Sequence, residues 1–368
     1  MSSAAISTND IRTHDIRIAA FEPLPSPGEL RERLPLGARR AALVAESRAG
    51  IARILAGEDD RLLVVVGPCS VHDPAAALAY ARRLAAVAAR HAERMLVVMR
   101  VYFEKPRTTD GWKGLINDPH LDGSHRVAEG LAIARRLLLD ILDAGMPVAG
   151  EFLEPTTPQY IADAVSYGAI GARTTESQVH RQLASGLSMP VGFKNGTDGD
   201  VQVAVDGCIA ASRPQTFLGT DEAGRAAVIS TLGNPAAHVI LRGGRGGPNF
   251  GAAQVADAAA LLARAGRPPR LVVDASHANS GKSPQRQREV VRLLTERIAA
   301  GAAGGATSIA GVMIESFLVA GRQEPRPGVP LVFGQSITDA CLGWEDTVAL
   351  LEGLAGASAC RSTPLVGV

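Results

Sequence analysis

The sequence predicts an α/β protein whose main domain is a closed (β/α)8 TIM barrel. From Arg61 onward, short β-branched runs alternate with helical stretches rich in Ala, Leu and Arg, a pattern typical of parallel strands joined by crossover helices. The chain of 368 residues has room for eight such units in one domain. Each predicted strand also ends in a polar or charged group, which fits a barrel with its chemistry at the strand ends.

Eight runs are predicted to form the strands of this barrel, at residues 62–67, 95–103, 147–152, 169–174, 190–195, 238–243, 270–276 and 311–316. Helices are predicted at residues 38–55, 74–92, 126–143, 177–186, 200–211, 252–265, 284–300 and 344–355. Residues 1–60 show no strand–helix repetition, so we expect an N-terminal extension followed by a barrel over residues 61–368. The β-rich stretch at about 215–231 falls between the fifth and sixth units and is predicted to be an inserted hairpin.

The charge balance excludes several classes of partner. The 38 Lys and Arg residues nearly balance the 37 Asp and Glu residues, and a net charge of +1 offers no general attraction for nucleic acid or an anionic membrane. The start of the chain lacks a signal peptide, and no apolar run reaches the roughly 18 residues of a membrane span, so we expect a cytoplasmic protein. The four cysteines form no CxxC pair and are expected to be thiols.

Lysine is rare in this chain. Only four of the 38 basic residues are lysine, and they are Lys105, Lys113, Lys194 and Lys282. Lysine provides a compact point charge and an ammonium that can give up a proton, which arginine does not. The residues around Lys105 and Lys194 favour a functional role for these two lysines. For about half of the four lysines, chance retention of lysine in an arginine-rich chain is a sufficient explanation.

Barrel closure is expected to gather cations from several strands at one end. These cations are Arg100, Lys105, Arg173, Lys194 and Arg242. Like charges are costly to bring together unless an anion binds there, and arginine and lysine both suit phosphate and carboxylate oxygens. We therefore expect a small, multiply anionic ligand such as a phosphorylated acid. The loop with Lys105, Arg107 and Thr108 could hold a second phosphate, or be an ordinary solvated basic loop.

Four residues are candidate metal ligands. Cys69, His277 and Glu315 follow or end neighbouring predicted strands, and Asp339 lies in the loop beyond. Their wide separation matches no short metal-binding motif. One thiolate, one imidazole and two carboxylates could hold Mn²⁺, Fe²⁺, Co²⁺ or Zn²⁺, and the ligand types do not decide among them. Each residue taken alone is equally compatible with a buried thiol, a core histidine or a surface carboxylate.

Several long motifs resemble the type I 3-deoxy-7-phosphoheptulonate (DAHP) synthases. They include GPCS at 67–70, RVYFEKPRTT at 100–109, GARTTESQVHR at 171–181, PVGFKNGTDG at 190–199, SHANS at 276–280 and ITDAC at 337–341. The resemblance implies that phosphoenolpyruvate and erythrose 4-phosphate condense in the entry step of the shikimate pathway. It implies divalent-metal ligands at Cys69, His277, Glu315 and Asp339, with Mn²⁺ favoured. It also implies phosphoenolpyruvate contacts at Arg100, Lys105, Arg173, Lys194 and Arg242.

The same resemblance assigns further roles. Arg107 and Thr108 match the loop for erythrose 4-phosphate, and Lys105 is expected to protonate the developing alkoxide. We expect Glu151, or a metal-bound water near Asp339, to position the water that attacks C2. A homo-oligomer, either dimer or tetramer, and a chorismate mutase partner are also implied as possible assemblies.

The extension and the hairpin resemble regions that bind an inhibitory aromatic amino acid, with the extension contributing across a subunit interface. The matching residues are Asn9, Asp10, Leu187, Ser188, Phe217 and Gly219. Gly219 replaces the serine of phenylalanine-sensitive members and leaves room for a phenol hydroxyl, so we expect tyrosine to inhibit. The segments 309–318 and 334–347 resemble tryptophan-sensitive members instead.

Two rival interpretations stay open. A class I aldolase would use the same barrel with Lys194 as Schiff-base nucleophile. A catalytically silent amino-acid sensor would act by binding a partner enzyme. Borohydride trapping tests the first, and release of phosphate from both substrates tests the second.

Overall fold

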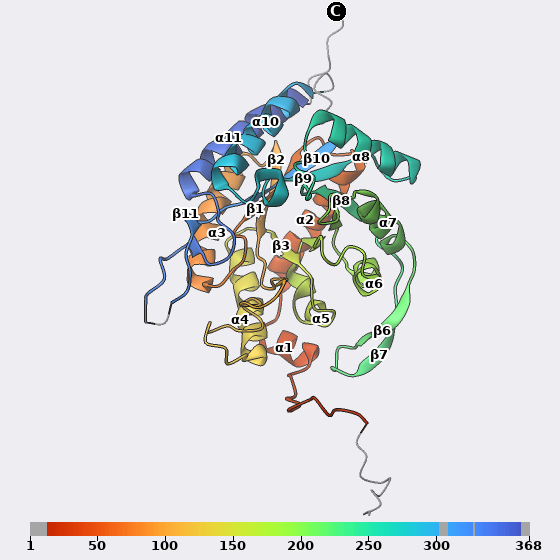
Figure 1. Cartoon of the computed structure of the whole chain (residues 1–368), viewed down its shortest axis with the longest axis vertical. Helices are drawn as coiled ribbons and strands as arrows, with labels where there is room; N and C mark the ends of the chain where they lie inside the picture. Colours follow the sequence, from red (N-terminus) through yellow and green to blue (C-terminus); the bar gives the residue numbers. More distant parts are fainter. Residues whose placement is uncertain (1–12, 302–307, 327, 362–368) are drawn as a thin grey trace, which may run out of the picture.

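Eight parallel strands form a closed barrel in this computed structural model, which describes residues 13–301, 308–326 and 328–361 (Figure 1). In their order around the barrel, the strands are β1 (Leu62–Gly67), β10 (Ile309–Glu315), β9 (Leu271–Asp274), β8 (His238–Leu241), β5 (Val191–Lys194), β4 (Tyr167–Ile170), β3 (Val148–Glu151) and β2 (Met95–Arg100). The predicted fold class is therefore confirmed.

The helices and remaining strands lie outside this barrel. The helices are α1 (Pro27–Arg33), α2 (Ala38–Ala56), α3 (Pro74–Arg90), α4 (Val127–Asp143), α5 (Thr157–Ile161), η2 (Ala162–Ala164), α6 (Gln178–Gly186), α7 (Gln202–Ala211), α8 (Ala252–Arg264), α9 (His277–Ser280), α10 (Pro284–Ala299) and α11 (Trp344–Arg361). The strands are β6 (Thr216–Thr220), β7 (Ala226–Ser230), β11 (Val319–Arg322) and β12 (Gln335–Ser336). Within the described ranges, no helix has the length and apolar character needed to span a membrane.

Every barrel strand is buried on both faces, as its apolar composition predicts. In β1, Leu63 and Val65 join Val98 of β2 in the cluster of side chains that fills the barrel interior. Leu62 and Val64 alternate with them and pack in the larger cluster beneath the surrounding helices. This two-sided core fixes the strands rigidly and thereby fixes the residues at their ends.

Helix α2 contributes to the barrel interior although it belongs to the predicted extension. Ile51, Ile54 and Leu55 pack in the same interior cluster as Leu63. A Cβ at Gly50 of α2 would touch the Leu96 side chain near the start of β2. The helix therefore closes the barrel at the N-terminal ends of the strands, opposite the ends where the candidate residues lie.

The inserted segment is an antiparallel hairpin of β6 and β7, which Figure 1 shows projecting from the body of the molecule. Its outer face is apolar and exposed, since Leu218 is 87% and Val228 is 69% accessible. Within the described residues, the hairpin forms a two-stranded sheet of its own and pairs with no barrel strand.

Some predicted bounds differ from the structure. The run 95–103 was predicted to be one strand, but β2 ends at Arg100, and the buried residues Val101, Tyr102 and Phe103 carry the chain into the next loop. The strand predicted at 169–174 is wrong after Ile170, because β4 ends there and Arg173 is exposed in a turn. Apolar burial continues beyond strand pairing only after β2, so composition overestimates the length of that strand.

Gly114 supports the loop that carries Lys105. The carbonyl of Lys113 accepts a hydrogen bond from the Lys105 N–H at 2.9 Å. The φ of Gly114 is +116°, and a Cβ there would overlap the carbonyl of Phe103. We expect Gly114→Ala to lower the free energy of unfolding by about 3 kcal/mol or more, because it combines backbone strain with a backbone clash. Urea denaturation measures this change.

Gly145→Ala is the matched control. Its φ is +84°, but a Cβ there would have nothing within 4 Å, so we expect only the strain cost of about 1 kcal/mol. Equal losses in the two variants would contradict the clash at Gly114.

Candidate active site

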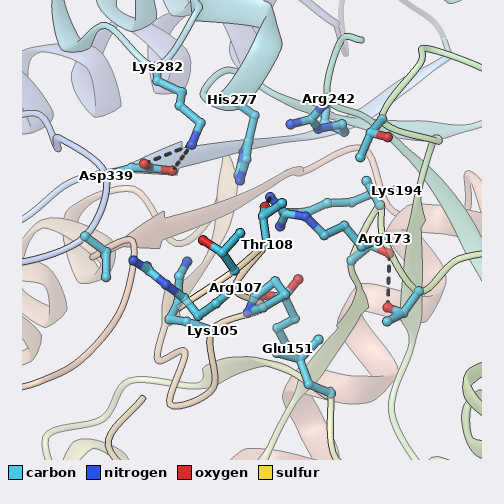
Figure 2. Close-up of a pocket in the computed structure, with 18 of the residues that line it drawn as sticks. Lys105, Arg107, Thr108, Glu151, Arg173, Lys194, Arg242, His277, Lys282 and Asp339 are labelled. Atoms are coloured by element: carbon cyan, nitrogen blue, oxygen red, sulfur yellow. Dashed lines mark hydrogen bonds and ion pairs between the residues drawn. The ribbon is translucent and has the colours of Figure 1, made fainter. Parts of the chain in front are cut away.

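A cavity of about 350 Å³ opens at the C-terminal ends of the barrel strands, and we refer to it as the strand-end cavity. Nine residues predicted from the sequence line it, and Figure 2 shows them converging from different elements. They are Lys105, Arg107, Thr108, Glu151, Arg173, Lys194, Arg242, His277 and Asp339. The structure therefore brings together in one site most of the residues that the sequence placed at strand ends.

The other three predicted residues, Arg100, Cys69 and Glu315, are buried and do not line the cavity. The Arg100 guanidinium donates to the Glu315 carboxylate, with Nη2 and Oε1 3.1 Å apart. It also lies over the ring of Tyr102, 4.0 Å from the centroid. Arg100 is thus engaged within the protein, and its predicted contact with phosphoenolpyruvate stays a prediction.

Three of the four candidate metal ligands lie close together. The Cys69 sulfur and carboxylate oxygens of Glu315 and Asp339 all lie within 4.8 Å of one another. His277 approaches this group, because its Nε2 is 3.9 Å from Glu315 Oε1. A buried sulfur and carboxylate, with a half-buried imidazole and a second carboxylate at the cavity, fit a divalent cation.

Asp274 orients the His277 ring, a role that the sequence did not predict. Asp274 Oδ2 forms an ion pair with His277 Nδ1 at 2.9 Å. The Ser276 hydroxyl lies 2.7 Å from the same His277 Nδ1 and donates to Asp274 Oδ1 at 2.7 Å. Because Nδ1 is held by the Ser276 hydroxyl and Asp274, Nε2 is left free to bind a metal, and protein metal sites commonly fix a histidine ligand in this way. The signal was present in the sequence, since Asp274 lies near the end of the seventh predicted strand, at 270–276.

The charges near the metal ligands shift their pKa values. Burial raises the pKa of the Cys69 thiol, and the neighbouring Glu315 carboxylate raises it further. Burial alone would lower the pKa of Lys105, but its acidic neighbours Cys69, Glu151 and Glu315 raise its pKa above the ordinary value. Lys105 Nζ lies 3.2 Å from the Cys69 sulfur. The ammonium is therefore held in its charged form beside the metal ligands.

Cations on the other side of the cavity suit an anion. Lys194 is buried and its Nζ lies 3.3 Å from Asp274 Oδ2. Burial lowers the pKa of Arg242, and its buried Nε has no hydrogen-bond partner within the described part of the chain. Arg242, Lys194 and Arg173 all line the strand-end cavity, and guanidinium and ammonium groups gathered around one cavity indicate a site for an anionic ligand.

The carboxyl group of Glu104 anchors the Lys105 loop. It accepts hydrogen bonds from the N–H groups of Leu153 and Glu154, each at 3.3 Å, and from the Thr157 hydroxyl at 3.0 Å. Burial raises the pKa of Glu104 to about 7, although these hydrogen bonds oppose the rise. The loop after β2 is thus tied to the segment after β3.

Two further cations of the cavity were not assigned to the site from the sequence. The sequence singled out Lys282 only as one of four lysines, and no sequence pattern pointed to Arg322. Arg322 reaches the cavity because β11 pairs with β12, which places it beside the segment Ile337–Asp339.

Comparison with known proteins identifies the family. The profile described as the DAHP synthetase I family matches residues 38–352. The chain belongs to the DAHP synthetase I family. The resemblance proposed from the motifs is therefore confirmed.

Relatives within the DAHP synthetase I family match over nearly the full chain. The phospho-2-dehydro-3-deoxyheptonate aldolase of Corynebacterium glutamicum is 54% identical and covers 97% of this chain and 98% of its own. A Phe-sensitive enzyme of that name from Escherichia coli is 54% identical, and a Trp-sensitive one from Salmonella typhimurium is 52% identical; each covers 94% of this chain and 98% of its own. Because these relatives differ in the amino acid they are named for, family membership leaves the effector undecided.

A solved structure has the same fold. The phospho-2-dehydro-3-deoxyheptonate aldolase of Francisella tularensis superposes with a TM-score of 0.91 at 49% identity and covers 94% of this chain and all of its own. The barrel described above is therefore the barrel of the DAHP synthetase I family.

A second cavity of about 610 Å³, which we call the side cavity, contains the predicted effector residues of this family member. Leu187, Ser188, Phe217 and Gly219 all line it, together with parts of α2 and α6. Asn9 and Asp10, the other two predicted residues, lie outside the described residues. The hairpin thus contributes to a cavity separate from the strand-end cavity.

The raised pKa of Glu104 predicts a pH-dependent stability. Because the pKa rises from 4.5 to about 7 on folding, the contribution of Glu104 is full below pH 4.5 and is lost as the pH rises through 7. We expect the stability of the wild type relative to Glu104→Gln to fall by about 3 kcal/mol over this range. Urea denaturation at a series of pH values measures the difference.

Glu154→Gln is the control, since Glu154 is an exposed neighbour of the same anchor. Its stability relative to the wild type is expected to change little over the same range. A Glu104→Gln difference that is independent of pH would contradict the raised pKa.

Proposed function

We propose that this protein is a metal-dependent DAHP synthase that condenses phosphoenolpyruvate and erythrose 4-phosphate with water to give DAHP and phosphate. The observation that carries the proposal is the position of the Cys69, Glu315 and Asp339 cluster directly beside a cavity lined by cations. The names of relatives that are 51–54% identical support the same reaction.

The cations opposite the metal ligands would bind phosphoenolpyruvate. Arg242, Lys194 and Arg173 line the same cavity. Guanidinium forks match phosphate and carboxylate oxygens, while the lysine ammonium adds a point charge. This binding would fix C3 of the enol in front of the second substrate.

Arg107 and Thr108 would hold the phosphate of erythrose 4-phosphate. Both lie on the loop after β2 and line the cavity, and the Arg173 guanidinium donates to the Thr108 hydroxyl at 3.5 Å. The two predicted phosphate sites are therefore adjacent, as a condensation between two phosphorylated substrates requires.

Cys69, His277, Glu315 and Asp339 would hold the divalent cation, with Mn²⁺ favoured. When bound, the cation would supply Lewis acidity toward the aldehyde oxygen. Lys105, 3.2 Å from the Cys69 sulfur, would donate a proton to that oxygen as C3 of phosphoenolpyruvate bonds to the aldehyde carbon.

Glu151 would position the water that completes the reaction. Gly171 has no side chain, and a Cβ there would meet Glu151 Oε1. The Glu151 carboxylate therefore packs directly against the backbone of Gly171. After the C–C bond forms, C2 is electron-poor and water adds to it. Cleavage of the bond between C2 and the phosphate oxygen then leaves the ketone and inorganic phosphate.

The side cavity would bind an aromatic amino acid. Tyrosine is favoured because Gly219 stands where phenylalanine-sensitive members carry a serine. Asn9 and Asp10 of a neighbouring subunit would complete it in a homodimer or homotetramer. Association with a chorismate mutase is a further possible level of regulation.

We expect the purified protein to release phosphate only when both substrates are present. EDTA is expected to lower this rate by at least about 100-fold, and added Mn²⁺ to restore it, because the aldehyde would lose its electrophilic activation. A colorimetric phosphate assay measures the rate. Activity that survives EDTA, together with borohydride trapping at Lys194, would support an aldolase mechanism instead.

We expect tyrosine to inhibit at lower concentrations than phenylalanine, and Gly219→Ser to reverse this order. A Cβ at Gly219 would overlap the end of the Ile229 side chain, which would be pushed into the cavity. We expect the inhibition constant of tyrosine to be about tenfold higher in the variant than in the wild type. Initial rates at varied inhibitor concentration measure this constant. Equal inhibition of the wild type by both amino acids would contradict the assignment.

A further inference from the structure

Lys282 bridges two of the candidate metal ligands. Its Nζ lies 3.0 Å from Asp339 Oδ1 and 2.9 Å from Asp339 Oδ2, as the dashed lines in Figure 2 show. Its backbone N–H donates to the His277 carbonyl at 2.8 Å. The lysine therefore contacts ligands that come from different strand ends, and it lines the strand-end cavity.

The backbone around Lys282 is strained. Its φ is +63°, and the φ of His277 is +52°, although neither residue is glycine. Side chains rarely adopt this left-handed region, and such strain persists where the surrounding structure imposes it, often at functional sites. The segment between α9 and α10 thus holds the Lys282 side chain at Asp339 despite a conformational cost.

The residue type is informative as well. This chain uses arginine for 34 of its 38 basic residues, and an arginine fork would hold a carboxylate through two parallel hydrogen bonds. Lysine makes a weaker, less directional contact. The Lys282 side chain is also 55% exposed, so it has room to move away from the carboxylate.

We propose that Lys282 is an exchangeable partner of Asp339, which a divalent cation displaces when it binds that carboxylate. This inference rests on the proposed metal dependence. Both Asp339 oxygens already contact the ammonium, and a divalent cation within reach of Cys69 and Glu315 repels it. The carboxylate therefore has a positive partner whether or not metal is bound, and metal binding must compete with the ion pair.

Titration calorimetry with MnCl2 on the full-length protein, after EDTA treatment and desalting, tests the proposal. We expect Lys282→Met to bind Mn²⁺ about five- to tenfold more tightly than the wild type, because it removes the competitor. We expect Lys282→Arg to bind a few-fold more weakly, because the guanidinium fork grips the carboxylate more firmly.

The arginine variant separates displacement from simple charge repulsion. Both cations repel the metal equally, so affinities that are equal in Lys282→Arg and the wild type would overturn the proposal. Weaker or unchanged binding by Lys282→Met would also overturn it, because Lys282 would then support the ligands. If Lys282→Met shows no thermal unfolding transition and is therefore not folded, Lys282→Gln serves as the neutral variant.

Arg322→Met is the matched control. Arg322 lines the same cavity, but its guanidinium pairs with Glu324 at 3.5 Å, so its loss should change Mn²⁺ affinity less than about twofold. A larger gain in this variant would overturn the proposal by showing a general charge effect. Absence of Mn²⁺ binding by the wild type would overturn the metal site itself, whereas a wrong order of affinities would overturn only the role of Lys282.

Discussion

Buried opposite charges at the C-terminal ends of the strands are the constraint on which the site depends. Arg100 and Glu315 lie 3.1 Å apart, and Lys194 and Asp274 lie 3.3 Å apart, so four strands are linked by two ion pairs. Loss of one partner from a buried pair leaves an uncompensated charge and costs about 3–5 kcal/mol. These four residues form a buried charged layer. Their ion pairs fix the positions of the side chains as much as the barrel strands do.

The buried charged layer positions residues on both sides of the strand-end cavity. Asp274 contacts both Lys194, on the anion-binding side, and His277, on the metal-binding side. Its pKa is held well below the ordinary value because His277, Lys194 and Arg100 outweigh the effect of burial. A permanently charged carboxylate can orient a lysine and a histidine at the same time, which couples the geometry of the two halves of the site.

The barrel and most of its site could be predicted from the sequence because strand alternation and strand-end positions follow from periodicity alone. Cys69, Glu315 and Asp339 were expected to meet and lie within 4.8 Å of one another. The contacts of Arg100 with Glu315 and of Asp274 with His277 could not be predicted, because they depend on side-chain directions within the buried layer. Arg322 was missed because the pairing of β11 with β12 leaves no periodic signal in so short a segment.

Helix α2 has a consequence for how such a protein can be rearranged. Its residues Ile51, Ile54 and Leu55 fill part of the barrel interior, while other residues of the same helix, Val44 and Arg48, line the side cavity. A gene fusion that joins another chain at residue 60 and thereby removes α2 would expose the N-terminal end of the barrel interior to water. An exchange of the leading segment that keeps this packing therefore has to join the chains before Ala38, and the resulting chimera keeps the α2 wall of the side cavity together with its own barrel.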